Sequence, residues 1–298
     1  MARRKWNWTQ KQLDKLSKVI SILDDLKEYK PLTLRQIYYQ LVSIGYIENK
    51  VSEYGMLSNM LKWARLDGHI AWNDIEDRVR AFHNLQGWKD KASFLDTALN
   101  SIANQYSRDL WQGQGRYVEV WIEKDALSSI FTNVCSGYGV SVIVCRGFSS
   151  VSFLNDFRVR LIKHDGKEPV MLYFGDLDPS GVEMLKAMET TLTDEMGIDG
   201  VEFKRIALLR DDIFKNKLPH NPDALKRTDT RAKKHVLNYG DLAVELDALR
   251  PDVLTQKVKD AVENEIGNVN AFNSQVETYH REVKELTALK GQFMGLVR

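Results

Sequence analysis

The chain has 298 residues, and its 42 Lys and Arg against 41 Asp and Glu give a formal net charge of +1. No run approaches about 20 apolar residues, which argues against a membrane span. The two cysteines, Cys135 and Cys145, exclude a disulfide framework and a cysteine zinc site. The N-terminus lacks the apolar core of a secretory signal, so we expect a reducing, cytoplasmic location.

The near-neutral total hides a segregation of charge along the chain. Residues 1–66 contain twelve Lys and Arg against six Asp and Glu, and residues 215–240 contain seven against two, so the remainder is acidic. Local basic surfaces of this kind are compatible with a nucleic-acid partner. The basic segment 215–240 is typical either of a mobile DNA-contacting loop or of a solvated loop, and the sequence favours neither.

The apolar spacing and capping patterns of residues 1–84 predict three short helices followed by an extended piece. Apolar residues recur at helical spacing over 9–28, and Thr33 begins a capping-box pattern that starts a second helix. We expect a third helix over Ser52–Leu66 and a short strand or wing over His69–Trp72. This order favours a winged-helix DNA-binding domain with Ser52–Leu66 as its recognition helix. A small helical domain that binds nothing is the alternative.

Residues 85–112 resemble a connecting helix, after which strands and helices alternate. The predicted strands are 117–122, 140–145, 170–175 and 201–208, and the predicted helices are 124–134, 149–162 and 179–192. Strands separated by helices of this length indicate an α/β domain, in which a parallel sheet is flanked by helices on both faces. We assign it to residues 113–298, including a helical C-terminal region over about 241–290.

Three acidic residues follow two of these predicted strands directly. Glu123 comes after the first strand, and Asp176 and Asp178 come after the third. Ligands of open parallel sheets bind at the carboxyl ends of the strands, and carboxylates that meet there need a proton or a cation. Oxygen ligands alone suit Mg²⁺. A structural alternative stays open, because Asp178 before Pro179 is also an ordinary helix N-cap.

A tyrosine on the second predicted helix is the other candidate. The apolar stripe of that helix includes Tyr38, whereas Tyr39 lies well off the stripe with Arg35 four residues before it. We therefore expect Tyr38 to be packed and Tyr39 to present its hydroxyl to solvent beside a guanidinium. A neighbouring cation favours the phenolate, which is the nucleophilic form. A surface tyrosine stacked on arginine is the alternative.

Several common catalytic motifs do not occur. The sequence contains no GxxxxGK[ST] phosphate loop and no GxSxG nucleophile turn, and Gly113-Gln114-Gly115 lacks the third glycine of a dinucleotide loop. The six histidines show no metal-ligand spacing.

Three short motifs, taken in order, resemble the topoisomerase VI A subunit family, which includes the meiotic double-strand-break transesterase. Residues 33–39, TLRQIYY, resemble its RxxYY segment in a winged helix. Residues 121–126, WIEKDA, resemble the opening of its Toprim domain, and residues 175–181, GDLDPSG, resemble its DxDPxG motif. Residues 244–249, VELDAL, resemble a stretch near the end of that fold.

The resemblance implies a role for each candidate residue. Tyr39 would attack a DNA phosphodiester, form a phosphotyrosyl bond and release a 3′-hydroxyl, while Arg35 would stabilise charge at the phosphate. Glu123, Asp176 and Asp178 would hold Mg²⁺. The family also implies a homodimer that cuts both strands of double-stranded DNA, with the tyrosine of one protomer meeting the metal site of the other. A separate ATPase subunit is a further possible partner.

One segment departs from the family pattern. Residues 146–150, RGFSS, stand where the family has a glycine-rich segment, so the local DNA contacts are expected to differ. The compact chain most resembles the short standalone relatives, called mini-A proteins, of mobile elements. The expected function is a Mg²⁺-dependent DNA-cleaving transesterase. The alternatives are a hydrolytic Toprim nuclease, in which metal-bound water attacks, and a catalytically silent DNA-binding dimer.

Overall fold

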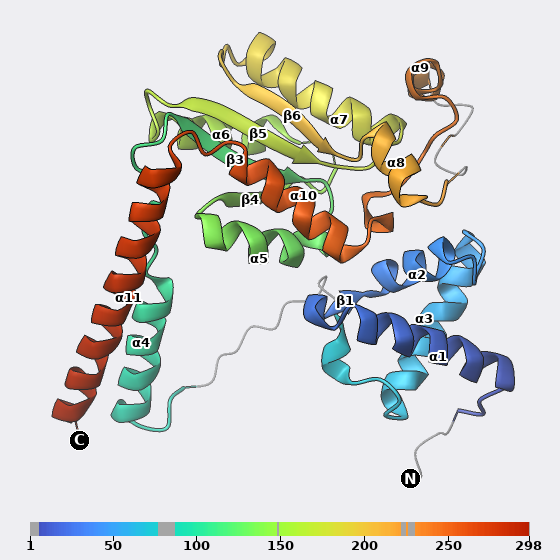
Figure 1. Cartoon of the computed structure of the whole chain (residues 1–298), viewed down its shortest axis with the longest axis horizontal. Coiled ribbons are helices and arrows are strands. Elements are labelled where there is room, and N and C mark those ends of the chain that lie inside the picture. The colour runs from blue at the N-terminus through green and yellow to red at the C-terminus, as the bar shows by residue number, and fades with distance from the viewer. Residues whose placement is uncertain (1–5, 77–86, 148, 222–224, 226–229, 298) are drawn as a thin grey trace.

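A computed structural model describes residues 6–76, 87–147, 149–221, 225 and 230–297. Figure 1 shows an N-terminal group of helices, a layered domain built on a sheet, and a pair of long helices that extends away from the sheet. We call residues 6–76 the N-terminal group and the layered part the sheet domain. No helix in these described ranges is both long and apolar enough to cross a membrane.

Three helices make up most of the N-terminal group. They are α1 (Gln10–Asp25), α2 (Leu34–Ser43) and α3 (Val51–Leu66). A capping box starts each of the first two, with the Thr9 and Thr33 side chains accepting hydrogen bonds from backbone amides three residues later. The predicted helices are therefore confirmed. The assignment of the group as a winged helix stays a prediction.

The extended piece of this group lies later than predicted. Residues 69–72 form no strand, because the chain turns at Gly68 in a left-handed conformation (φ +79°) and then enters a 3-10 turn. The short strand is instead β2 (Ile75–Glu76), which pairs in parallel with β1 (Leu32–Thr33). The last part of the predicted domain, residues 77–84, lies outside the described residues.

The predicted parallel sheet is confirmed. It contains β3 (Arg116–Ile122), β4 (Ser141–Val144), β5 (Glu168–Phe174) and β6 (Glu202–Ala207), in the order β4-β3-β5-β6 and all parallel. After β3 the chain moves outward to β4 and then returns to the other side of β3. The strand order therefore reverses between β3 and β5, and such a switch point is where open α/β sheets bind ligands.

Helices cover both faces of the sheet, as the pattern predicted. One face carries α5 (Ser128–Tyr138) and α10 (Pro251–Glu263), and the other carries α6 (Val151–Ile162) and α7 (Pro179–Thr190), as Figure 1 shows. Alternate residues of β3 supply the two cores, with Val120 on the α5 side and Trp121 on the α6 side. The predicted helix start at 124 is too early, because residues 125–127 form a 3-10 turn before α5.

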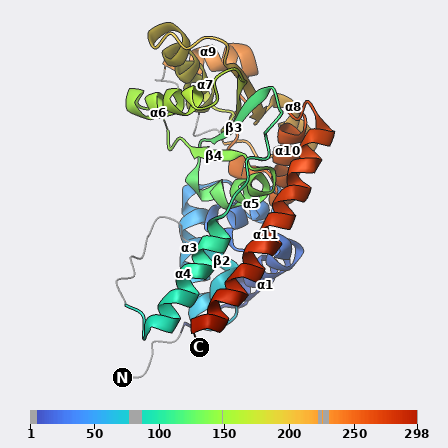
Figure 2. The ribbon, with the colours of Figure 1, turned by 90° about the vertical axis from the view of Figure 1, so that its left-hand side faces the viewer.

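The long helix pair consists of α4 (Lys91–Gln105) and α11 (Val269–Val297), which lie side by side in Figures 1 and 2. An ion pair between Arg108 and Glu282 ties the chain after α4 to α11 at 2.8 Å. The predicted connecting helix over 85–112 is therefore shorter, and it packs on the C-terminal helix. Its residues 85 and 86 lie outside the described ranges.

The basic segment 215–240 is only partly a loop. It contains the end of α8 (Arg210–Asn216) and all of α9 (Thr230–Tyr239). Residues 222–224 and 226–229 lie outside the described ranges. Further short elements are 3-10 turns at 27–29, 72–74 and 246–248 and a π-helical turn at 191–195 that extends α7.

Candidate functional site

Two of the residues predicted to meet at the sheet edge, Glu123 and Asp176, are in contact. Ile122 pairs in register with Phe174, so Glu123 and the turn after β5 lie at the same level. The backbone amide of Asp176 donates a 2.9 Å hydrogen bond to Oε2 of Glu123. Glu123 and Asp176 therefore meet at the switch point, with the carboxylate of Glu123 on the backbone of Asp176.

Asp178 serves as the N-cap of α7. Its Oδ1 accepts the Gly181 amide at 2.7 Å, and Pro179 occupies the first helical position. The structural alternative is therefore confirmed for this oxygen. Its negative charge nevertheless acts on Glu123. The pKa of Glu123 lies above its ordinary value, first because of burial and then because of the nearby Asp178 carboxylate. A single carboxylate thus caps a helix and contributes to an acidic cluster.

Two glycines allow the chain to close around these acids. A Cβ atom at Gly175 would lie 2.7 Å from Oε2 of Glu123, and one at Gly181 would lie 2.4 Å from the carbonyl oxygen of Asp176. Both contacts are far closer than carbon and oxygen tolerate. The glycines are therefore required for the close approach of backbone and carboxylate.

A partly buried arginine from β6 holds the acidic turn in place. The guanidinium of Arg205 donates to the carbonyl oxygens of Gly175 at 3.2 Å and Gly181 at 3.1 Å, and also to that of Asp176. Burial lowers the pKa of Arg205 from its ordinary value. Because its donors are used on backbone carbonyls, Arg205 positions the turn. Sequence reasoning placed this residue in a strand without assigning it a role.

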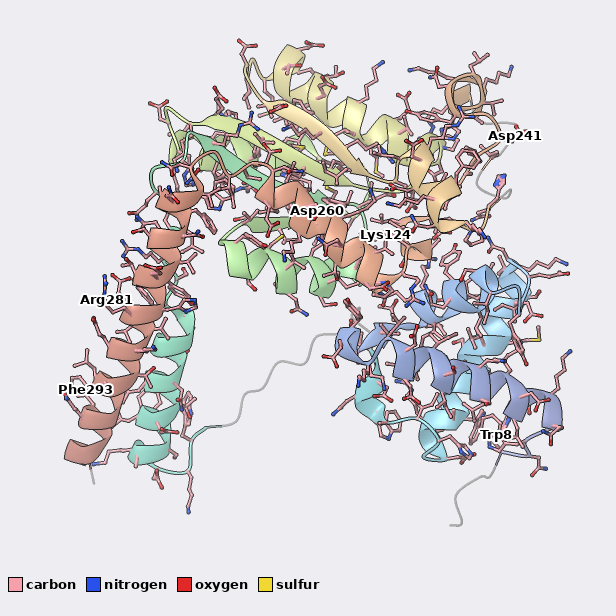
Figure 3. All side chains as sticks on the ribbon, in the orientation of Figure 1. Trp8, Lys124, Asp241, Asp260, Arg281 and Phe293 are labelled. Atoms are coloured by element: carbon pink, nitrogen blue, oxygen red, sulfur yellow. The ribbon has the colours of Figure 1, made fainter. Side chains whose placement is uncertain are left out.

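Lys124 lies at the centre of a second set of carboxylates. Its Nζ is 2.9 Å from Oδ2 of Asp176, 2.8 Å from Oε2 of Glu245 and 2.8 Å from Oδ2 of Asp247. Burial acts to lower the pKa of Lys124, but the three carboxylates hold it well above its ordinary value. Figure 3 labels Lys124 where the sheet domain faces the N-terminal helices.

Tyr39 is buried, and the expectation that it presents its hydroxyl to solvent is wrong. Its exposed fraction is 3%, close to the 4% of Tyr38, which is packed as predicted. Helices α1 and α3 cover one side of α2, and the turn at 246–248 covers the other. The helix face assigned to solvent from its periodicity is therefore buried by a segment about two hundred residues later.

The cations act to lower the pKa of Tyr39, as predicted for Arg35, but other groups outweigh them. Burial, followed by the charge and hydrogen bond of Glu245, raises the pKa of Tyr39 well above its ordinary value, against the opposing charges of Lys124 and Arg35. Burial also acts to raise the pKa of Glu245, but Lys124 and Arg35 hold it below its ordinary value. The described arrangement thus keeps the phenol protonated and the carboxylate ionised.

Arg35 is placed as predicted, on α2 one turn before Tyr39. Its Nη1 donates to Oε2 of Glu245 at 2.7 Å, and its side chain is 43% exposed. The exposed part faces a cleft of about 560 Å³ between α2 and α3 on one side and the ends of β3 and β4 on the other. Residues lining the cleft include Arg35, Tyr54, Arg65, Glu123, Lys124 and Arg146.

The cleft combines cations and carboxylates. Arg146, from the segment that replaces the glycine-rich stretch, pairs with Asp125 at 2.7 Å and is 73% exposed. The Nε atom of Arg65 is buried and has no hydrogen-bond partner among the residues that the structure describes. A ligand that carries negative charge and a divalent cation would match such a lining.

The carboxylate oxygens at the sheet edge are of the kind that binds Mg²⁺, although several of them already have hydrogen-bond or ion-pair partners. In the described ranges, no group of three or more His, Cys, Asp and Glu is arranged to hold a metal ion. Asp176 gives Oδ1 to the Leu246 amide at 2.8 Å and Oδ2 to Lys124, and Asp178 gives Oδ1 to its helix. Glu123 and Asp178 each offer a second oxygen, and Mg²⁺ is commonly bound through one or two carboxylates with water completing its shell.

No protein-family model matches the chain, and the search of characterised proteins gives no match. The assignment of function therefore depends on the residues of the site. Lys124 and Glu245 belong to motifs that sequence reasoning quoted, but it assigned them no role.

Proposed function

We propose that the chain is a Mg²⁺-dependent DNA-cleaving transesterase related to the topoisomerase VI A subunit, with a winged helix in residues 1–84 and a Toprim domain in 113–298. The observation that carries the proposal is a continuous network of polar contacts. It runs from Arg35, one turn before Tyr39 on α2, through Glu245 and Lys124 to Asp176 at the switch point of the sheet. The two motifs that the resemblance assigns to chemistry are thereby joined.

The reaction would be an in-line displacement at phosphorus. The phenolic oxygen of Tyr39 forms a bond to the phosphorus of a DNA phosphodiester as the bond to the 3′-oxygen breaks. The phenolic proton is lost, the 3′-oxygen gains one, and the product is a 5′-phosphotyrosyl link with a free 3′-hydroxyl. The half-exposed guanidinium of Arg35 would offset the charge that develops on the phosphate oxygens.

Glu123 and Asp178 would hold Mg²⁺ through their remaining oxygens, with Asp176 beside them. The ion would supply Lewis-acid polarisation of the phosphate. Arg205 would keep the turn that carries Asp176 in place, since its donors engage the backbone carbonyls of that turn.

Double-stranded DNA is the proposed partner, with the cleft as the site of the scissile strand. Cutting both strands needs two tyrosines, so we propose a homodimer. A separate ATPase subunit would couple cleavage to strand passage. The basic segments 1–66 and 215–240 would add contacts to the phosphate backbone.

A hydrolytic nuclease is the second candidate, and one observation favours it. Tyr39 is buried with a raised pKa, whereas the carboxylate of Glu123 already lies against the turn that carries Asp176. Water could then attack in place of the phenol. A catalytically silent DNA-binding dimer is the third candidate.

Incubation of supercoiled plasmid with the protein and Mg²⁺ tests the proposal, followed by denaturation and separation of free DNA from protein-bound DNA. Wild type is compared with Tyr39→Phe and Glu123→Gln. Tyr38→Phe is the matched control. The hydroxyl of Tyr38 belongs to the neighbouring residue but donates to Oδ1 of Asn49 at 3.0 Å, away from the acidic site. DNA binding of each variant is measured in parallel.

Transesterification predicts protein-linked 5′ ends with wild type and Tyr38→Phe, none with Tyr39→Phe and few with Glu123→Gln. Cleavage that survives Tyr39→Phe but not Glu123→Gln would favour the nuclease. Binding without cleavage by every protein, with and without ATP, would favour the silent dimer.

A further inference from the structure

One face of α3 lines the cleft with hydroxyl and guanidinium groups. Tyr54, Ser58 and Arg65 are all lining residues, and Glu123 and Lys124 at the end of β3 line the same cleft. Four residues separate Tyr54 from Ser58 and seven separate Ser58 from Arg65, spacings that place side chains on one face of a helix. The helix therefore turns a row of hydrogen-bond donors toward the cleft.

Arg65 differs from the other cations of the cleft because it has no carboxylate partner. Arg35, Lys124 and Arg146 each form an ion pair with at least one carboxylate. In the described part of the chain, no carboxylate pairs with Arg65, although Glu76 also lines the cleft. The charge of Arg65 is therefore not offset by contacts like those of its neighbours.

Most donors of the Arg65 guanidinium have no acceptor among the described residues. A guanidinium carries five N–H donors. Nη1 of Arg65 donates to the carbonyl oxygen of Ile75 at 3.4 Å, which is long for a hydrogen bond, and Nε is buried without a partner in the described ranges. The guanidinium lies over the ring of Trp72, 5.2 Å from its centroid. Stacking thus orients a planar fork of donors, the geometry that matches a phosphate group.

The two hydroxyls extend the row along α3. Neither the Tyr54 nor the Ser58 hydroxyl has a hydrogen-bond partner among the described residues. The ring of Tyr54 packs edge-on against that of Tyr38, with centroids 5.3 Å apart, which fixes its position. At the rise of an α-helix, the row from Tyr54 to Arg65 is about 16 Å long. That length exceeds a single phosphate group and suits a strand that carries several.

We propose that Tyr54, Ser58 and Arg65 form a phosphate-binding subsite that holds the backbone of a DNA strand in the cleft. The inference deepens the proposed function and rests on it for the identity of the ligand. It needs no tyrosine of the same chain in the cleft, whose described lining does not include Tyr39. It also assigns backbone contacts to the cleft face of α3, whereas the sequence predicted a recognition helix.

Binding of a short duplex in the presence of EDTA tests the subsite without requiring cleavage. Fluorescence anisotropy at several salt concentrations gives the affinity and the slope of log K against log salt. Arg65→Gln removes the charge, and Arg65→Lys keeps the charge but not the fork. Lys62→Gln is the matched control, because Lys62 is an exposed cation of the same helix that does not line the cleft.

A structural role of Arg65 is measured separately. Its contacts with Ile75 and Trp72 join α3 to the chain that follows it, so Arg65→Gln can lower the unfolding temperature. Such a role alone would leave the salt slope of the folded variant unchanged. Ser58→Ala supplies a variant at an exposed position. If Arg65→Gln does not fold, Arg65→Lys and Ser58→Ala decide, and wild-type affinity of both overturns the proposal.

We expect Arg65→Gln to weaken binding roughly tenfold, as for the loss of a hydrogen bond between charged groups, and to reduce the slope by about 1. Arg65→Lys should weaken binding less and keep the slope, and Ser58→Ala should weaken binding roughly threefold without changing the slope. Lys62→Gln should match wild type. Wild-type affinity and slope in folded Arg65→Gln would overturn the proposal. An equal loss with Lys62→Gln would also overturn it, since the solvent face of α3 would then bind DNA.

The subsite and the proposed reaction can fail separately. Weaker binding by Arg65→Gln, without any Tyr39–DNA adduct from wild type in Mg²⁺, would support the subsite and contradict the transesterase. A Tyr39–DNA adduct together with unchanged binding by Arg65→Gln would do the reverse. A wild-type protein that binds no duplex would contradict both.

Discussion

Arg35 and Glu245 are 210 residues apart in the sequence, and their side chains form an ion pair of 2.7 Å between Nη1 and Oε2. This pair ties α2 to the loop before the 246–248 turn, and through Lys124 it reaches the acids at the sheet edge. The contact joins residues that the sequence places in separate motifs. The predictions below test the parts of this arrangement separately.

Lys124 should be important for stability. Replacing it by Met leaves Asp176, Glu245 and the fully buried Asp247 without their shared cation. Breaking a buried ion pair by removing one partner typically costs about 3–5 kcal/mol, so Lys124→Met should lower the free energy of unfolding by about that amount. Urea unfolding at pH 7 measures it.

Lys234→Met is the matched control, because Lys234 pairs with Glu183 in an exposed position, where such pairs contribute at most about 1 kcal/mol. If the two substitutions lower the free energy of unfolding equally, Lys124 is not the shared cation of the three carboxylates.

Gly181 should not tolerate even the smallest side chain. A Cβ atom there would lie 2.4 Å from the carbonyl oxygen of Asp176, so Gly181→Ala must displace the acidic turn. Overpacking of this kind costs about 1–3 kcal/mol. The expected results are a lower unfolding midpoint and weaker Mg²⁺ binding by calorimetry.

Gly137→Ala in α5 is the control, since nothing lies within 4 Å of its added Cβ. Alanine is the better helix former, so this variant should be neutral or more stable by up to about 1 kcal/mol. A neutral Gly181→Ala with unchanged Mg²⁺ affinity would refute the close packing of the turn.

Arg146 should contribute to DNA affinity through charge. It is 73% exposed at the cleft and paired only with Asp125 among the contacts described for it. If it neutralises one phosphate, Arg146→Ala should weaken binding and reduce the slope of log K against log salt by about 1. Fluorescence anisotropy with a short duplex at several salt concentrations measures the slope.

Arg281→Ala on α11, far from the cleft in Figure 3, should leave that slope unchanged. A salt response that is the same for Arg146→Ala and wild type would exclude a phosphate contact at this position.

The two cysteines should be unreactive in the folded chain. Burial raises the pKa of Cys135 and of Cys145 to about 12, so few thiolates are present at pH 8. A chromogenic disulfide reagent should therefore react at least roughly a hundredfold more slowly in buffer than in urea, where both thiols are accessible. Rapid modification of one thiol equivalent in buffer would contradict this packing.

The sequence predicted the local features of the fold well. The capping box at Thr33 is a contact over three residues, and the strand–helix alternation of the sheet domain reflects the burial of each element. The convergence of Glu123 and Asp176 was also predictable, because the carboxyl ends of neighbouring parallel strands must meet. Each of these inferences needed only nearby residues or a general rule of topology.

The surroundings of Tyr39 could not be predicted in the same way. Helical periodicity indicates which face of α2 is apolar, but it carries no information about a turn at 246–248 that packs on the other face. The pairing of Lys124 with Glu245 and Asp247 likewise joins residues more than a hundred positions apart. The pKa of Tyr39 follows from these distant groups, and its predicted direction was therefore wrong.

The most direct test of the proposed function is to identify the amino acid that becomes linked to DNA. Plasmid is incubated with the protein and Mg²⁺, the mixture is denatured and digested with nuclease and protease, and the remaining nucleotide-bearing peptide is sequenced by mass spectrometry. Transesterification predicts a 5′-phosphate on Tyr39, within the peptide that also contains Tyr38, and its loss in Tyr39→Phe. Cleaved plasmid without any nucleotide on Tyr39 would contradict it.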